Sequence, residues 1–324
     1  MTNPIPRFYV NPRAALAVVC VAFCASVLAQ TTPPPAQTPS GSTPPGATSA
    51  PKQTQAPATT APAQPQAPAT PPHRTPPAAK TSDEFAAYNA AANNPDTAGA
   101  EKAADDFAQK YPQSELRALL YGNIMRRYQQ SNDSEKTLEM ARKVLTYEPN
   151  DPVALVMAAT VLAERTRESD LDREERYDEA IKHAQKALET VNTDLMVPSN
   201  ASTEQIDAAK KVLQSMSHSA IGMVDLDRKN DAGAVQEFQQ SIALSAPGQV
   251  EPLTYLRLAL AQDHLQQYRE ALVSANKAVE SSPANSPVAM LAKQEVDRLT
   301  KLIGNGPAGG ANPAPAPTSS TTPK

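Results

Sequence analysis

The sequence predicts an all-α fold, a right-handed solenoid of four to five helix pairs with a C-terminal cap helix. Three observations predict it: the distribution of proline, the distribution of charge and an internal repeat. Of the 32 prolines in 324 residues, fifteen fall within 30–82 and five after residue 306, whereas only nine fall within 83–303. Since proline removes backbone donors and interrupts helices, only the middle region can hold an extended helical core. We therefore divide the chain into four parts: 1–29, 30–82, 83–303 and 304–324.

Residues 1–29 are typical of a secretory signal. Arg7 and Arg13 precede an apolar run, 14–29, which ends in Val-Leu-Ala. Cleavage is expected after Ala29, giving an exported, periplasmic or cell-envelope protein. The alternative is an uncleaved membrane anchor through 14–29, although ~16 residues are short for a bilayer core of ~30 Å. Both cysteines lie in this run, so the predicted mature chain has no disulfide, thiol or Cys-bound metal.

The segment 30–82 is rich in Pro, Ala and Thr and shows no helical or strand period. Such a composition favours disordered chain with short polyproline II stretches. It is interpreted as a tether that holds the following domain away from a membrane or wall, or as a passive linker. Residues 304–324 form a second tail of the same kind.

Charge is confined to the middle region. All 34 acidic residues lie within 83–303, against 24 of the 30 basic ones, which gives that region a net charge of −10. Nucleic-acid binding requires a basic face that displaces counterions from phosphates, so an acidic domain argues against it.

An internal repeat occupies 83–303. Four stretches, 134–151, 176–192, 231–247 and 267–283, share a small residue followed by further residues four, seven and eight positions later. These offsets place the four positions on one stripe of a helix. The stripes are Thr137-Ala141-Val144-Leu145, Ala180-Ala184-Ala187-Leu188, Ala234-Phe238-Ser241-Ile242 and Ala271-Ala275-Ala278-Val279.

A second apolar helix precedes each stretch, with anchors spaced three, one and three residues apart. Small residues at the third anchor (Ala159, Gly222 and Ala259) would let the paired helices approach closely. Helix starts are marked by Asp151-Pro152 and Ser286-Pro287, and by capping boxes at Ser202 with Gln205 and Thr81 with Glu84. The anchor sets are Tyr121-Ile124-Met125-Tyr128, Leu155-Ala158-Ala159-Leu162, His218-Ile221-Gly222-Asp225 and Tyr255-Leu258-Ala259-Gln262.

This pattern resembles the tetratricopeptide repeat (TPR), a helix–turn–helix unit of 34 residues. The small residues at the start of the stripes are 43, 54 and 37 residues apart, so insertions are expected at 165–175 and 193–213, the latter with an extra helix beginning near Glu204. Residues 287–303 are similar to the cap helix that closes a solenoid. A shorter likeness, through Phe107, Tyr111-Pro112 and Ser114, is to bacterial outer-membrane assembly and Tol–Pal-accessory repeat proteins.

No constellation of catalytic residues is found, and we expect neither an enzyme nor a cofactor or metal site. The four histidines lack a second His or a Cys nearby, and there is no phosphate-binding loop or nucleophile elbow. The acidic insertion 164–179 begins like a calcium loop but has Glu175 where glycine is required and Ile181 where the loop needs an acid. A solvated, mixed-charge segment is the favoured interpretation, and a calcium-binding or catalytic module is the alternative.

The resemblance implies that the first helices line a concave groove that binds a partner protein or peptide. We expect a non-enzymatic scaffold in the cell envelope, with membrane contact only if 14–29 is uncleaved; the alternative is a structural tether or spacer protein. A further alternative is that 193–213 or the cap helix already fills the groove. The lining residues expected to meet a partner are Arg126, Val156, Met216, Met223, Leu226, Leu253, Leu256, Leu260 and Asp263.

Overall fold

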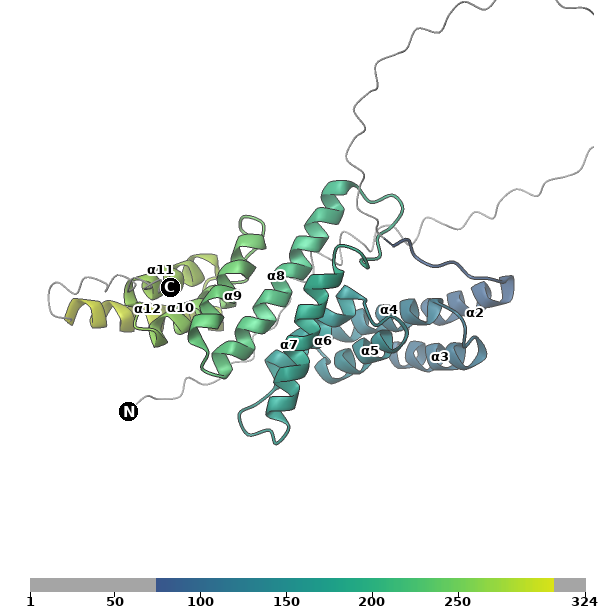
Figure 1. Ribbon diagram of the computed structural model, residues 1–324, viewed down its shortest axis with the longest axis horizontal. Coiled ribbons are helices and arrows are strands. Elements are labelled where there is room, and N and C mark those ends of the chain that lie inside the picture. Colours follow the sequence, from purple (N-terminus) through teal and green to yellow (C-terminus); the bar gives the residue numbers. More distant parts are fainter. Residues whose placement is uncertain (1–73, 306–324) are drawn as a thin grey trace, which may run out of the picture.

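The computed structural model describes residues 74–305, and these form a row of eleven helices (Figure 1). The predicted signal segment, most of the proline-rich segment and residues 306–324 of the predicted C-terminal tail lie outside the described residues, whereas residues 304 and 305 belong to the last helix. The helices are α2 Ser82–Ala92, α3 Thr97–Lys110, α4 Leu116–Gln130, α5 Ser134–Tyr147, α6 Pro152–Arg165, α7 Arg173–Thr190, α8 Thr203–Asp227, α9 Asp231–Leu244, α10 Pro252–His264, α11 Tyr268–Ser281 and α12 Pro287–Asn305.

The helices pack mainly against their neighbours in the chain, and α6 also packs against α8, the first helix of the next pair. Within each pair the two helices are in contact, and the second helix of a pair also contacts the first helix of the next one. Figure 1 shows the result, a row in which sequence order follows the long axis from α2 to α12. Contacts confined to neighbouring units define a solenoid, so the predicted all-α solenoid is confirmed.

The stripes predicted on the second helices form the core. Ala180, Ala184 and Ala187 on α7 are at most 1% exposed, and Phe238 on α9 is fully buried. Gly222 explains how that large ring fits. A Cβ atom at residue 222 would lie 2.9 Å from Cε1 of Phe238, so glycine lets α8 and α9 approach around the ring.

Three of the turns within helix pairs share one backbone conformation. Asn132, Lys229 and Gln266 each stand two residues after a first helix ends and have φ of 61°, 65° and 61°. The amide of the next residue donates to a carbonyl five residues back, at 2.9, 2.8 and 2.9 Å. This bond is typical of a Schellman helix end. The repeat therefore extends into turns where the side chains show no common pattern.

The two predicted insertions are present, but the second differs from expectation. Residues 166–172 connect α6 to α7, as predicted. The region after α7 contains no separate extra helix: α8 runs unbroken for 25 residues from Thr203. Ser202 and Gln205 form the predicted capping box at its start, with hydrogen bonds of 3.3 and 2.9 Å. The inserted turns therefore lengthen a repeat helix.

The segment before α2 folds back along the solenoid. The Arg74 carbonyl accepts a hydrogen bond from the Val197 amide at 3.1 Å, and its guanidinium meets the Glu148 carboxylate at 2.5 Å. Residue 74 thus lies beside the insertion at the middle of the row. Among the helices described, none combines the length and apolar character needed to cross a membrane.

Candidate functional site

The predicted lining residues lie on α4, α6, α8 and α10, a surface that we call the first-helix face. Its three stretches differ in chemistry. The stretch on α4 is polar, the stretch on α6 is covered by the insertion, and the stretch on α8 and α10 keeps several apolar side chains part-exposed.

The α4 stretch centres on Arg126. Its side chain is half-buried and donates a hydrogen bond to the Asn123 amide oxygen. Tyr88 of α2 lies close by: burial raises the pKa of its hydroxyl, opposed by a hydrogen bond with Asn123 and by the charge of Arg126. A charged donor and two neutral polar groups suit a polar or anionic contact better than an apolar one.

Val156, the predicted lining residue of α6, is fully buried. It belongs to a cluster formed by the start of α6, the end of α7 and the insertion, including Val197, Ile206 and Leu213. The insertion therefore covers the middle of the first-helix face, and Val156 does not line an accessible surface. On α6, therefore, residues of 193–213 occupy the groove, as one of the two alternatives drawn from the sequence describes.

The α8 and α10 stretch is only partly open. Met223 and Leu256 are 6% and 4% exposed, and Leu256 packs under Val288 and Ala292 of the cap helix α12. Asp263 is held by the Arg298 guanidinium at 2.6 Å. These three predicted residues are therefore built into the fold. The predicted residues that remain part-exposed here, and that we call the apolar strip, are Met216, Leu226, Leu253 and Leu260.

Three charged residues of this region were not among the predicted lining residues. Glu164 is in the last turn of α6, Glu251 is the N-cap of α10, and Arg257 is in the second turn of α10. Burial raises the pKa of Glu164; the charge of Arg257 lowers this pKa and the charge of Glu251 raises it. Arg257 had one sequence signal, its position directly after the predicted lining residue Leu256.

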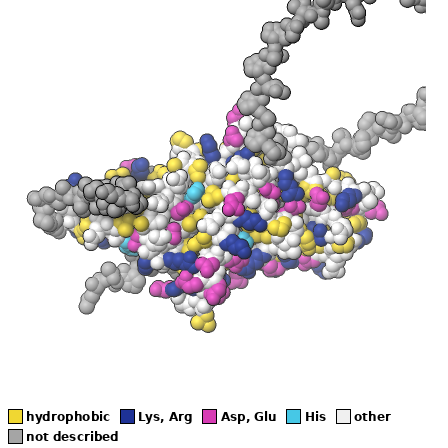
Figure 2. All heavy atoms as spheres, viewed as in Figure 1, with side chains coloured by type: hydrophobic (Ala, Val, Ile, Leu, Met, Phe, Trp, Pro, Cys, Tyr) yellow, Lys and Arg dark blue, Asp and Glu magenta, His cyan; other side chains and the backbone are white. Residues whose placement is uncertain are grey.

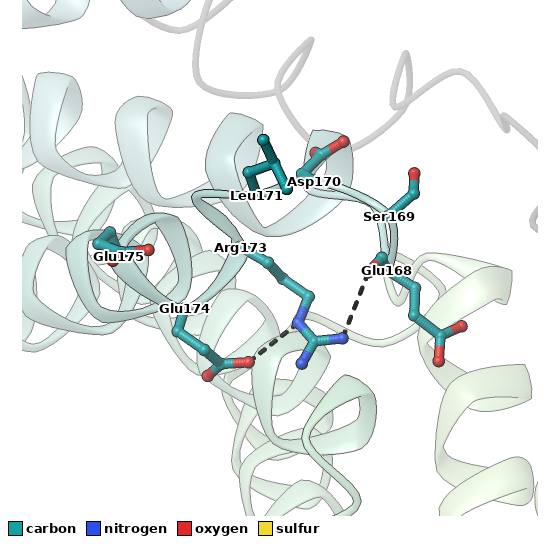
Figure 3. A pocket seen from close by; sticks show the side chains of 7 residues that line it. All are labelled: Glu168, Ser169, Asp170, Leu171, Arg173, Glu174 and Glu175. Carbon is teal, nitrogen blue, oxygen red and sulfur yellow. Dashed lines mark hydrogen bonds and ion pairs between the residues drawn. The ribbon is translucent and has the colours of Figure 1, made fainter.

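The acids of the connection between α6 and α7 and of the start of α7 are paired with nearby arginines. The connection forms a shallow hollow, in which Arg173 reaches Glu174 at 2.9 Å and the Glu168 carbonyl at 3.4 Å (Figure 3). Arg228 of the α8 C-cap binds Glu174 at 3.0 Å and Asp178 at 2.6 Å. Figure 2 likewise shows acidic and basic side chains interspersed over this side of the molecule. No cluster of three or more potential metal ligands occurs in residues 74–305.

The described histidines each pair with an acid on the solenoid. His218 lies 2.7 Å from Glu237 and joins the two helices of one pair. His264 lies 2.8 Å from Asp231 and joins two successive pairs. His183 lies 3.4 Å from Glu179, and burial lowers its pKa. The first two contacts join different helices, whereas the third lies within α7.

Comparison with known proteins gives matches among solved structures. No protein-family model and no curated protein matches the chain. PilW, a type IV pilus biogenesis factor, is 16% identical, covers 71% of this chain and 96% of its own, and has a TM-score of 0.41. A thermophilic TPR protein of Thermus thermophilus is 14% identical over 62% and 90% of the two chains, with a TM-score of 0.40. The MamA protein is 16% identical over 59% and 90%, with a TM-score of 0.37.

Because these TM-scores are low, the fold is assigned from the helices of this chain. Helices packed in successive pairs, recurring Schellman turns, buried small-residue stripes and a terminal cap helix are all present in the described part of this chain. The protein is a tetratricopeptide-like α-solenoid.

Proposed function

We propose that this protein is an exported scaffold whose apolar strip binds a segment of another cell-envelope protein. The observation that carries the proposal is the strip itself. Met216 and Leu226 on α8 and Leu253 and Leu260 on α10 remain part-exposed on two helices in contact with one another. Part-exposed apolar side chains on adjoining elements favour association with a partner.

Leu260 is the best probe of the strip. It is part-exposed and, unlike Met216, Leu226 and Leu253, is not packed against any of the core clusters. A photo-crosslinking amino acid at residue 260 should capture a partner in cells. The same group at Asn276, on the exposed side of α11 in the same helix pair, should capture none.

The substitution Leu260→Asp tests whether the apolar strip contributes to binding of the partner segment. A charge in the strip should abolish the crosslink formed from a second probe at Leu253, while the circular dichroism of the protein stays unchanged. Equal crosslinking from residues 260 and 276, or binding that survives Leu260→Asp, would refute the proposed site.

Export is tested independently, by the N-terminal sequence and the cell fraction of the mature chain. The signal-like run predicts a soluble envelope protein that begins at Gln30. A chain that begins at residue 1 and sediments with membranes would support the tether alternative instead.

A further inference from the structure

The chain before α2 crosses the solenoid from one end to its middle (Figure 1). Near α2, the Lys80 ammonium donates to the Gln113 carbonyl at 3.3 Å, in the turn between α3 and α4. Six residues earlier, Arg74 reaches two further loops, the α5–α6 turn and the connection from α7 to α8. Extended chain rises about 3.3 Å per residue, so this stretch spans roughly 20 Å, or about two spacings between packed helices. Residues 74–80, which we call the strap, therefore lie across the loops that join successive helix pairs.

The strap is stiff and is fastened at its α2 end. Pro76 and Pro77 fix the backbone φ and favour extended chain. The Lys80 amide donates to the buried Glu84 carboxylate at 2.6 Å. Ala79 packs against the main core cluster. A stiff segment loses little conformational entropy when it docks, so a small number of contacts can hold its far end in place.

At the far end of the strap, Arg74 binds two separate loops. Its guanidinium donates two hydrogen bonds to the Glu148 carboxylate, at 2.5 and 3.3 Å. Its carbonyl accepts a hydrogen bond from the Val197 amide at 3.1 Å, and its backbone forms a parallel β-bridge with Met196. A two-pronged contact between guanidinium and carboxylate is among the stronger hydrogen-bonded pairs in proteins. The Glu148 side chain is 16% exposed, so water screens this pair less than an ordinary surface pair.

The connection from α7 to α8, residues 191–202, has one hydrogen bond to a distant part of the chain. That bond is the one from the Val197 amide to Arg74. Within the described residues, the other hydrogen bonds of the connection reach at most four residues along the chain. Leu195 and Val197 are 3% and 0% exposed, and they pack in the cluster that buries Val156 of α6. The strap is therefore bound to the segment that covers the middle of the first-helix face.

We propose that the strap is a latch: Arg74 holds the connection 191–202 closed over α6, and its release uncovers Val156 and the middle of the first-helix face. With the latch broken, the connection keeps only its apolar contacts and its short-range hydrogen bonds, so it opens more often.

The uncovered stretch of α6 adjoins the apolar strip, because α6 packs against α8. The open state therefore offers a partner a longer apolar surface, and a segment that binds both stretches shifts the latch towards its open state. This consequence rests on the proposed function, whereas the latch itself does not.

Thiol labelling of the full chain tests the latch. Cys20 and Cys24 are replaced by Ser, and a single cysteine is introduced by Val156→Cys or, as a control, by Ala158→Cys. Both native side chains are fully buried, but Val156 lies under the connection 191–202 and Ala158 lies in the main core cluster. The rate at which an excess of a thiol reagent labels each cysteine under native conditions reports how often that site opens.

Arg74→Ala and Glu148→Ala should each raise the labelling rate at residue 156 by roughly tenfold, because each removes the charge-assisted pair. The double variant should raise it little further, since both substitutions break the same contact. Pro76→Gly/Pro77→Gly, which loosens the strap without changing a charge, should raise the rate at residue 156 as well. Arg167→Ala, whose side chain is exposed on the α6–α7 connection, should leave it unchanged. None of these variants should change the rate at residue 158.

Two results would overturn the latch. One is an unchanged labelling rate at residue 156 in Arg74→Ala. The other is an equal rise at residues 156 and 158, which would mean that Arg74 supports the whole solenoid and not the cover of α6. The latch and the proposed function fail separately. The expected response at residue 156 without a crosslink from residue 260 would keep the latch and refute the partner site, and the reverse pattern would keep the partner site and refute the latch.

Discussion

Two glycines in the first helices should respond oppositely to the same substitution. A Cβ atom at residue 222 would lie 2.9 and 3.0 Å from two ring carbons of Phe238, whose side chain is fully buried and cannot move aside. A Cβ atom at residue 122, within α4, would have no neighbour within 4 Å. Both glycines lie inside helices, so only their surroundings distinguish them.

The magnitudes follow from two competing effects. Replacing glycine with alanine inside a helix stabilises it by roughly 0.5–1 kcal/mol. Forcing an extra carbon into a filled core destabilises by about 1–3 kcal/mol. Gly122→Ala should therefore stabilise the protein by up to ~1 kcal/mol, whereas Gly222→Ala should destabilise it by up to ~2 kcal/mol, since the clash exceeds the helix gain.

Urea unfolding followed by circular dichroism measures both changes. A solenoid can unfold in parts, so hydrogen exchange in α8 and α9 should accompany the global measurement. The double variant Gly222→Ala/Phe238→Leu makes room for the new methyl group. It should show a coupling energy of about 0.5–3 kcal/mol in a double-mutant cycle. If Gly222→Ala stabilises the protein as much as Gly122→Ala, the close approach of α8 to α9 around Phe238 is refuted.

Three further predictions concern the insertion and its neighbours. Val156→Asp places an unpaired charge in a fully buried cluster. It should destabilise the protein by several kcal/mol and expose 191–213 to protease. An unchanged digestion pattern would contradict the conclusion that the insertion covers Val156. Ser202→Ala should lose about 1 kcal/mol and speed amide exchange in the first turn of α8, whereas Thr203→Ala, next to the cap, should do neither. His183 should titrate in NMR spectra below the ~6.5 of a free histidine, because burial opposes its protonation more than Glu179 favours it. The folded protein should therefore lose stability as the pH falls below ~6.5, because the unfolded chain binds the proton more readily than the folded one. A titration midpoint above ~6.5, for a resonance that is absent from His183→Gln, would show that the imidazole is not desolvated.

Much of the fold could be read from local patterns. The stripe on each second helix was predictable because a helix repeats every 3.6 residues and its buried face must be apolar and small. The cap at Asp151 was predictable because its side chain accepts a hydrogen bond from the amide of Ala154, only three residues away. The turns at Asn132, Lys229 and Gln266 were missed because a left-handed residue there is fixed by backbone hydrogen bonds and not by residue type.

The functional face was predicted less completely. Helical periodicity identified the side of α6 on which Val156 lies, but could not show that the insertion, more than 30 residues later and including the start of α8, covers it. Leu256 and Asp263 have the spacing of lining residues, yet α12 buries one and binds the other through Arg298. Whether a side chain is exposed depends on which distant segment packs over it, and no local period carries that information.

The sequence by itself determined the helix pairs, their order and the insertions, because these depend on periodicity, capping and small-residue stripes within about thirty residues of chain. The tertiary structure alone decided where the first-helix face stays open. It placed the insertion over Val156 and the cap helix over Leu256. It also joined Asp263 of α10 to Arg298 of the cap helix. These outcomes depend on how successive pairs are stacked, which is the sum of many side-chain contacts and is not written in any one repeat.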